Sequence, residues 1–355
     1  MTKIDRARSI LQGPDLLLVS PSADLAYLIG YAGHASERPT LLAIPREGRA
    51  RMLMPQLEAP RLPALEDVDV VAYDETDDPY ARLADALGRE APGSVAISNE
   101  AWAALLLGLQ KAWPSARFQA ATPLLRELRM RKSAREIEAL DRAGRVDDAV
   151  FEELRSAGIQ GRSEREVGRM LEDMLRDRGL TDVWQIVAGG PNAASPHHFS
   201  GDWIIAEGDA VVLDYGGSLD GYQADITRTV HVGRPGDEFV HVYEIVRQSQ
   251  EAGVAASEPG VRAGEVDRAA RAVIEASGYG DFFIHRTGHG IGLEIHEEPY
   301  IVAGNNLTLE LGMTFSVEPG IYLPGRFGVR IEDIVVIVEA GARRLTDATR
   351  ELVIL

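Results

Sequence analysis

Hydrophobic and polar positions follow two rhythms along the first third of the chain. Short apolar runs rich in β-branched residues predict strands, and longer segments with apolar residues every three or four positions predict helices. The expected strands are 16–20, 41–44, 51–54, 68–73 and 94–98, and the expected helices lie near 80–89 and 100–111. This alternation predicts an α/β domain, and no phosphate-binding glycine motif follows its strands.

The pattern changes near residue 130. Two amphipathic helices are expected at 133–157 and 163–179, each opening with a serine followed three residues later by a glutamate, which is a capping box. Beyond residue 183, segments bounded by Gly, Pro and Asp predict strands at 211–216, 222–232, 313–323 and 329–339, with helices at 238–256 and 264–277. We therefore expect an α/β domain over residues 1–128 and an α+β domain over residues 129–355.

The composition, 45% hydrophobic and 26% charged, is that of a folded globular protein. A formal net charge of −18 argues against nucleic-acid binding, which needs a basic face. The absence of cysteine excludes disulfides, thiolate metal sites and cysteine nucleophiles. The longest apolar run near the N-terminus, residues 16–19, is too short for a secretory signal or a membrane helix. We expect a soluble, cytoplasmic protein with no membrane partner.

Two aspartates flank a turn signal in the segment VVLDYGGSLDGYQADITRTV. Asp214 and Asp225 lie on either side of Asp220–Gly221, and a hairpin folded about Leu219 and Asp220 would place them directly opposite each other. Their Cβ atoms would then be about 4.5–5.5 Å apart. Because both segments are apolar enough to be buried, the facing carboxylates would need a proton or a cation to be stable.

A second acidic pair and a histidine cluster follow. Glu318 and Glu332 flank the turn LPGRFG, with Gly325 at their midpoint, so they too could face each other across a hairpin. Between the two hairpins, HRTGHGIGLEIHEEP contains His285, His289 and His296. One imidazole and four carboxylates suit Mn²⁺, Co²⁺ or Zn²⁺, with two ions about 3.5–4 Å apart sharing bridging carboxylates.

A loop upstream, PNAASPHHFSGD, carries His197 and His198 directly after Pro196. A histidine near a metal pair is well placed to hydrogen-bond a developing oxyanion. Taken alone, each of these residues has a simpler interpretation: the aspartates as turn residues, Glu318 as a strand end and His289 as a packed loop residue. The conjunction of all of them favours a metal site.

These segments resemble the pita-bread metallopeptidases, and within them the proline-specific Xaa-Pro dipeptidases (prolidases) and Xaa-Pro aminopeptidases. The resemblance is carried by VVLDYGG…ADITRTV, HRTGHGIGLEIHEEP, FSVEPGIYLPG and GVRIEDIVVI, and LRMRKSAREIEAL is similar to the family's lead-in to its catalytic domain. It implies a creatinase-type N-terminal domain before a pita-bread domain. The implied metal ligands are Asp214, Asp225, His289, Glu318 and Glu332, and the implied catalytic residues are His197, His296, Glu318 and Arg330.

The resemblance also implies a mechanism and partners. Two divalent cations, expected to be Mn²⁺ with Co²⁺ or Zn²⁺ as alternatives, activate water for attack on the carbonyl before proline. Glu318 passes a proton to the leaving nitrogen, His197 and His296 hydrogen-bond the substrate and the oxyanion, and Arg330 supports the site. The expected partners are small peptides with proline in second position, and a second copy of the chain in a homodimer.

Within this family an Xaa-Pro dipeptidase is expected, and an aminopeptidase acting on longer peptides is the main alternative. A dipeptidase needs a cation for the substrate carboxylate, yet Tyr300 follows HEEP where some prolidases carry an arginine. Arg38 or Arg46 of the N-terminal domain, from the same chain or from a partner subunit, is the candidate to supply that charge. A methionine aminopeptidase, a creatinase-like hydrolase and a non-catalytic binding module are less favoured, because of the large N-terminal domain and the complete ligand set.

Overall fold

The computed structural model describes residues 2–65, 67–88 and 91–355. The chain divides into two compact units, Met1–Arg129 and Met130–Leu355, one residue beyond the predicted domain boundary. Each unit has its own buried apolar core. None of the helices in the described ranges combines the length and the hydropathy that crossing a bilayer would require.

The N-terminal unit contains a six-stranded sheet in the order β4-β3-β2-β1-β5-β6. Its strands are β1 (Leu16–Val19), β2 (Leu41–Pro45), β3 (Ala50–Pro55), β4 (Val68–Tyr73), β5 (Ser94–Ile97) and β6 (Arg117–Ala120). All five predicted strands are present. The sequence analysis missed β6, an edge strand whose residues are mostly exposed and therefore carry no apolar run.

Five helices accompany this sheet: α1 (Lys3–Ser9), α2 (Ala23–Ile29), α3 (Pro79–Ala86), α4 (Ala103–Ala112) and α5 (Thr122–Arg129). α3 and α4 correspond to the two predicted helices, although the predicted end of the first, Arg89, lies outside the described residues. Leu83, Leu105 and Leu109 bury their side chains against the strands. α1 and α2 were missed because seven residues are too few to establish a helical period.

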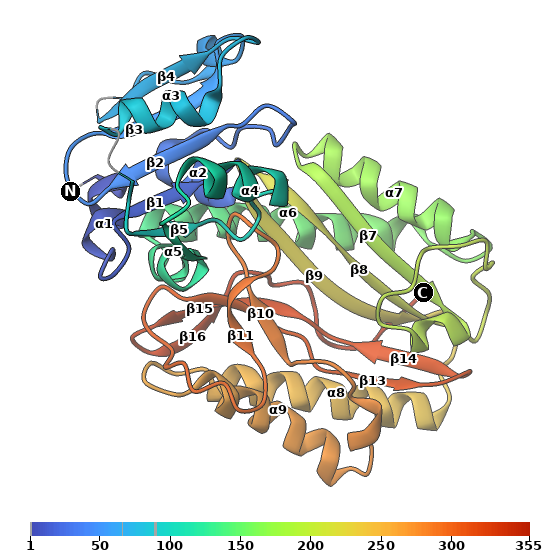
Figure 1. Cartoon of the computed structure of the whole chain (residues 1–355). Coiled ribbons are helices and arrows are strands. Elements are labelled where there is room, and N and C mark those ends of the chain that lie inside the picture. The colour runs from blue at the N-terminus through green and yellow to red at the C-terminus, as the bar shows by residue number, and fades with distance from the viewer. Residues whose placement is uncertain (1, 66, 89–90) are drawn as a thin grey trace. The chain divides into compact units, whose positions relative to one another are not determined.

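The first half of the C-terminal unit packs α6 (Ala134–Ala157) and α7 (Glu164–Asp177) against a four-stranded sheet, as Figure 1 shows. The strands are β7 (Thr181–Gly189), β8 (Ala210–Leu219), β9 (Tyr222–His231) and β17 (Val353–Ile354), in the order β17-β9-β8-β7. Both predicted capping boxes are confirmed, at Ser133 with Glu136 and at Ser163 with Glu166.

The second half places α8 (Asp237–Ala256) and α9 (Ala263–Ala276) side by side (Figure 1). Their apolar faces pack against a five-stranded sheet in the order β11-β10-β12-β15-β16 and against the ribbon β13-β14. The strands are β10 (Gly288–Gly290), β11 (Glu297–Ile301), β12 (Thr314–Val317), β13 (Gly320–Leu323), β14 (Phe327–Arg330), β15 (Asp333–Val338) and β16 (Gly341–Arg344).

The two long strands predicted at 313–323 and 329–339 are each interrupted. Val317 pairs with Asp333 and Gly320 with Arg330, so both ladders are centred on Gly325, as predicted. Between the ladders, however, the backbone N–H of Glu318 donates to Thr287 O at 2.8 Å, and that of Glu332 donates to Thr227 O at 3.1 Å. The prediction of continuous strands was wrong because the two acidic residues bind backbones outside their own hairpin.

A buried ion pair lies next to the interruption at Glu332. Arg228 of β9 and Asp333 of β15 are 2.7 Å apart, with their side chains 1% and 0% exposed. The Arg228 guanidinium also donates to the carbonyls of Thr227, Glu332, Ala348 and Thr349. Asp333 in turn accepts hydrogen bonds from Gln250, Arg344, Thr346 and Arg350. The network therefore ties β9, β15, α8 and the C-terminal segment together.

Replacing Arg228 should destabilise the protein strongly. Arg228→Met removes a buried cation beside Asp333 and the donor of several carbonyls, so we expect the free energy of unfolding to fall by about 3–5 kcal/mol. Denaturant unfolding of the chelator-treated protein, followed by circular dichroism, measures the loss. Arg145→Met is the control, because Arg145 forms an exposed pair with Asp141 and should change stability by less than about 0.5 kcal/mol. Equal effects of the two variants would contradict the role of the network.

Candidate metal centre

Asp214 and Asp225 reach the site from the hairpin of β8 and β9. The turn falls one residue later than predicted, on Asp220–Gly221, where both residues have positive φ (53° and 84°) as this type of two-residue turn requires. Asp214 consequently lies opposite Thr227, two residues beyond Asp225. The prediction that the aspartates face each other directly was therefore wrong. They lie diagonally on the same face of the sheet, still within reach of a shared ligand.

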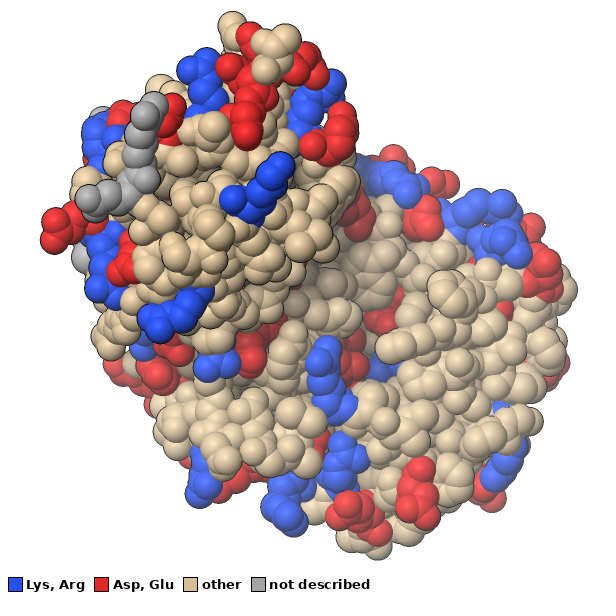
Figure 2. Space-filling view, in the orientation of Figure 1, with Lys and Arg blue, Asp and Glu red and all other residues tan. Residues whose placement is uncertain are grey.

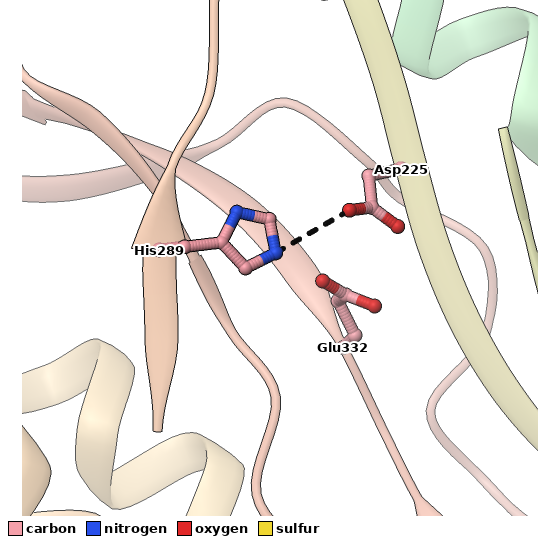
Figure 3. A group of neighbouring side chains, drawn as sticks. All are labelled: Asp225, His289 and Glu332. Carbon is pink, nitrogen blue, oxygen red and sulfur yellow. Dashed lines mark ion pairs between the residues drawn. The ribbon is translucent and has the colours of Figure 1, made fainter. Parts of the chain in front are cut away.

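Three side chains converge closely: Asp225 from β9, His289 from β10, and Glu332 from the break between β14 and β15. One ligand atom each of Asp225, His289 and Glu332 lies within 4.8 Å of the others, and all three side chains are buried. Figure 3 shows the His289 ring and the two carboxylates pointing toward a common space. His289 Nε2 is 3.6 Å from Asp225 Oδ2 and 3.4 Å from Glu318 Oε1. The arrangement is that of ligands around a cation.

The glycines on either side of His289 allow its strand to fit at this point. A Cβ at Gly288 would lie 1.8 Å from the carbonyl oxygen of Ser316, and one at Gly290 would lie 2.4 Å from the backbone of Glu298. Both distances are far below a van der Waals contact. β10 can therefore run between β11 and β12 and carry the imidazole to the carboxylates only because both neighbours lack a side chain.

Three of the four carboxylates are each held by a hydrogen bond to one oxygen. Asp214 Oδ2 accepts from Arg330 Nη2 at 2.6 Å, Glu332 Oε2 from Thr227 Oγ1 at 2.7 Å, and Glu318 Oε1 from Ser316 Oγ at 3.1 Å. In contrast, Asp214 Oδ1, Asp225 Oδ1 and Glu332 Oε1 are buried and have no hydrogen-bond partner among the described residues. Buried carboxylate oxygens without donors are costly, so the donor set fits divalent cations.

The protonation of the cluster reflects its burial. Burial, together with the neighbouring carboxylates, raises the pKa of Asp225 and of Glu332 well above their usual values. Burial likewise raises the pKa of Glu318 to about 7. Burial and the nearby His296 lower the pKa of His289 to about 3, so this imidazole is neutral near neutral pH and available as a ligand.

The cluster opens into a cavity of about 610 Å³ within the C-terminal unit. All five predicted metal ligands line it, and so do the predicted catalytic residues His197, His296 and Arg330. The other lining residues are Trp184, Ile186, Pro196, His285, Arg286 and Ile295. The structure therefore brings the five predicted metal ligands and the predicted catalytic residues together around one cavity.

The two adjacent loop histidines point to different surroundings. His197 lines the cavity, whereas His198 Nε2 lies 2.8 Å from Glu164 Oε2, away from the cavity lining. The His296 ring meets the His289 ring edge-on, with centroids 4.2 Å apart. His197 and His296 therefore line the cavity together with His285 and the predicted ligand His289.

Sequence reasoning missed several residues that shape the site. Tyr322 OH accepts from Arg330 Nη1 at 2.9 Å and lies 2.8 Å from His285 Nε2, but within the run GIYL it reads only as an apolar strand residue. The Arg286 guanidinium lies 4.4 Å from the centre of the Tyr300 ring and lines the cavity. Its place inside HRTGHG, next to the histidine cluster, was a signal that could have identified it.

The chain is similar in sequence and in fold to known proteins. A profile of metallopeptidase family M24 matches residues 138–339, and one of the creatinase/prolidase N-terminal domain matches residues 3–131. The chain is 41% identical to a probable dipeptidase, PepE, of Mycobacterium tuberculosis, covering 95% of this chain and 91% of that protein. It is 34% identical to an Xaa-Pro dipeptidase of Lactobacillus delbrueckii, covering 99% and 98%. A prolidase structure from Thermococcus sibiricus superposes with a TM-score of 0.94 at 38% identity, covering 99% and 98%.

Binding of a divalent cation to this centre should release protons. Burial raises the pKa of Glu318 to about 7, so this carboxyl is partly protonated at pH 7, and the raised pKa values of Asp225 and Glu332 let them keep protons to higher pH than ordinary carboxyls. A bound cation must displace these protons. Lower pH favours the protonated, metal-free state, so the affinity for Mn²⁺ should rise as pH rises through about 7. His289 should release no proton, because its lowered pKa keeps it neutral.

Isothermal titration calorimetry of chelator-treated protein with Mn²⁺, in buffers of different ionisation enthalpy, counts the released protons. An observed enthalpy that does not change with the buffer would contradict the protonated carboxyls.

Proposed function

This chain belongs to metallopeptidase family M24, and from that membership we propose that it hydrolyses the peptide bond before proline in Xaa-Pro dipeptides. The observation that carries the proposal is the composition of the 610 Å³ cavity. Its lining combines carboxylates that have an oxygen without a hydrogen-bond partner, a neutral imidazole and an arginine, Arg286. Relatives named as Xaa-Pro dipeptidase and prolidase along nearly the whole chain support it. An Xaa-Pro aminopeptidase acting on longer peptides is the second candidate.

Asp214, Asp225, His289, Glu318 and Glu332 are proposed to hold two divalent cations, with Mn²⁺ as the expected ion. Bound there, the cations supply Lewis-acid polarisation and an activated water. The hard oxygen donors, with one nitrogen donor among them, suit Mn²⁺ and also allow Co²⁺ or Zn²⁺. The unpartnered oxygens of Asp214, Asp225 and Glu332 support this assignment.

The remaining roles follow from position and protonation. Glu318, whose pKa burial raises to about 7, can take up a proton and return it to the leaving proline nitrogen near neutral pH. His197 and His296 line the cavity and are proposed to hydrogen-bond the developing oxyanion and the substrate. Arg330 holds Asp214 and Tyr322 in place through hydrogen bonds of 2.6 and 2.9 Å. Trp184, Ile186 and Ile295 provide an apolar wall suited to a proline ring.

Arg286 is the cation that we propose to bind the substrate's C-terminal carboxylate. Arg286 lines the cavity, and its guanidinium stacks on the ring of Tyr300, the residue that follows HEEP. Tyr300 therefore positions an arginine that comes from the start of the same motif. Arg38 and Arg46, the alternatives considered from the sequence, already have partners within the N-terminal unit. Arg38 pairs with Glu37 and Glu75, and Arg46 donates to the carbonyls of Gly13 and Pro14.

The proposed partners are small peptides. Lys and Arg side chains on the face drawn in Figure 2 are interspersed with Asp and Glu, and the net charge is −18. This distribution offers no obvious attraction for a polyanion on that face. The homodimer and the cytoplasmic location stay predictions from the sequence.

Hydrolysis of Ala-Pro and of Ala-Pro-Ala by the Mn²⁺-loaded protein tests the activity. We expect cleavage of Ala-Pro that disappears on chelation and returns when Mn²⁺ is added, with Ala-Pro-Ala cleaved much more slowly. Released amino acids, quantified by chromatography, give the rates. Faster cleavage of the tripeptide would favour the aminopeptidase, and cleavage of neither would refute the proline assignment.

Replacing Arg286 should reduce the preference for dipeptides. Arg286→Met removes the proposed carboxylate partner, so kcat/KM for Ala-Pro should fall by about 10- to 100-fold, equivalent to a charged hydrogen bond of about 1.5–3 kcal/mol. Hydrolysis of Ala-Pro-amide, which lacks the carboxylate, should change much less. Arg38→Ala and Arg46→Ala are the comparison variants. If one of them alters the dipeptide-to-amide ratio while Arg286→Met does not, the clamp belongs to the N-terminal unit.

A further inference from the structure

Glu164, the first residue of α7, is a buried carboxylate that the proposed mechanism does not use. Its side chain is 0% exposed and accepts four hydrogen bonds. Oε1 accepts from the backbone N–H of Gly189 at 2.8 Å and from Asn192 Nδ2 at 2.9 Å. Oε2 lies 2.8 Å from His198 Nε2 and accepts from the backbone N–H of Gly201 at 2.9 Å. All four partners belong to the loop that carries His197.

The charge of Glu164 is compensated locally. Among the described residues, its ion-pair partner is His198. The carboxylate also lies in the first turn of α7, where the free N–H groups of a helix stabilise negative charge. Moving any of the four donors away would leave a buried negative charge without that hydrogen bond, which is costly. The carboxylate and its partners therefore hold one another in place.

The loop has little apolar packing of its own. Between Gly189 and Gly201 the buried residues are small ones, Gly189, Gly190 and Ala193, and the large side chain of Phe199 is 92% exposed. Polar contacts therefore hold this segment. Besides the bonds to the Glu164 carboxylate, the backbone of α7 contributes Arg165 N to Gly201 O at 3.0 Å.

We propose that Glu164 is a positioning residue that presents His197 to the metal cavity. Its carboxylate ties Gly189 and Asn192 on one side of His197 to His198 and Gly201 on the other, so the short segment between them has little freedom to move. The two adjacent histidines have different roles. His197 faces the cavity, and His198 binds the loop to Glu164. This inference rests on the proposed function, in which His197 hydrogen-bonds the substrate.

A double-mutant cycle between Glu164 and His197 tests the coupling. Glu164→Gln keeps the size but turns an NH₂ group toward donors, so kcat/KM for Ala-Pro should fall by about 10- to 100-fold, mostly in kcat. In a His197→Ala background the same substitution should change kcat/KM by less than about twofold, because its effect passes through His197. The visible spectrum of the Co²⁺-loaded protein should stay unchanged. Losses that multiply independently in the two backgrounds would overturn the proposal.

Two further variants separate positioning from folding. Glu166→Gln, two residues along the same helix, removes a capping-box carboxylate that hydrogen-bonds Ser163 and not the loop of His197, and its activity should match that of the unmodified protein. His198→Ala removes one of the four donors and should lower kcat/KM by about 3- to 10-fold, again only when His197 is present. If Glu164→Gln does not fold, a His198→Ala loss that persists without His197 overturns the proposal.

Hydrogen–deuterium exchange provides a readout that needs no substrate. In Glu164→Gln, the peptide covering residues 189–201 should exchange faster than in the unmodified protein, while the peptide covering β8 should not. Exchange of the loop that is unchanged by the substitution overturns the positioning role. A protein that cleaves no Xaa-Pro peptide but shows the faster exchange would refute the proposed function while retaining the structural role of Glu164.

Discussion

Mutual repulsion among four carboxylates, three of them buried, is the constraint around which the C-terminal unit is organised. Asp214, Asp225, Glu318 and Glu332 line one cavity, and burial raises the pKa of the last three. Such a cluster is stable only with protons or cations between its members. The interrupted strands, the glycines beside His289 and the network behind Glu332 all serve to hold these side chains close despite that cost.

Two kinds of buried carboxylate in this unit differ in how their oxygens are partnered. Glu164 and Asp333 are satisfied by protein donors on both oxygens and fix the backbone around them. Asp214 and Glu332 have one oxygen anchored and the other without a partner in the described chain. The first kind fixes the backbone, and the second kind leaves an oxygen open to the proposed cations. The same residue type thus builds both the scaffold and the proposed metal centre.

Where the sequence-based predictions were wrong, the error lies close to the site. The strands predicted at 313–323 and 329–339 break at Glu318 and Glu332, because these residues bond to Thr287 and Thr227 instead of continuing their own ladder. The β8–β9 turn was placed one residue early, so the aspartates are diagonal neighbours. Propensity and periodicity report local preference, and both features depend on contacts between segments that are far apart in the chain.

The sequence by itself determined the class of the fold, the capped helices α6 and α7, the centre of the second hairpin and the acidic and histidine residues that meet at the cavity, because periodicity, capping boxes and motif spacing are local signals. Only the tertiary structure decided which oxygens are left open, that Arg286 stacks on Tyr300, and that Glu164 holds the loop of His197. Those contacts join residues that are 14 to more than 100 positions apart, and only the folded chain brings them together.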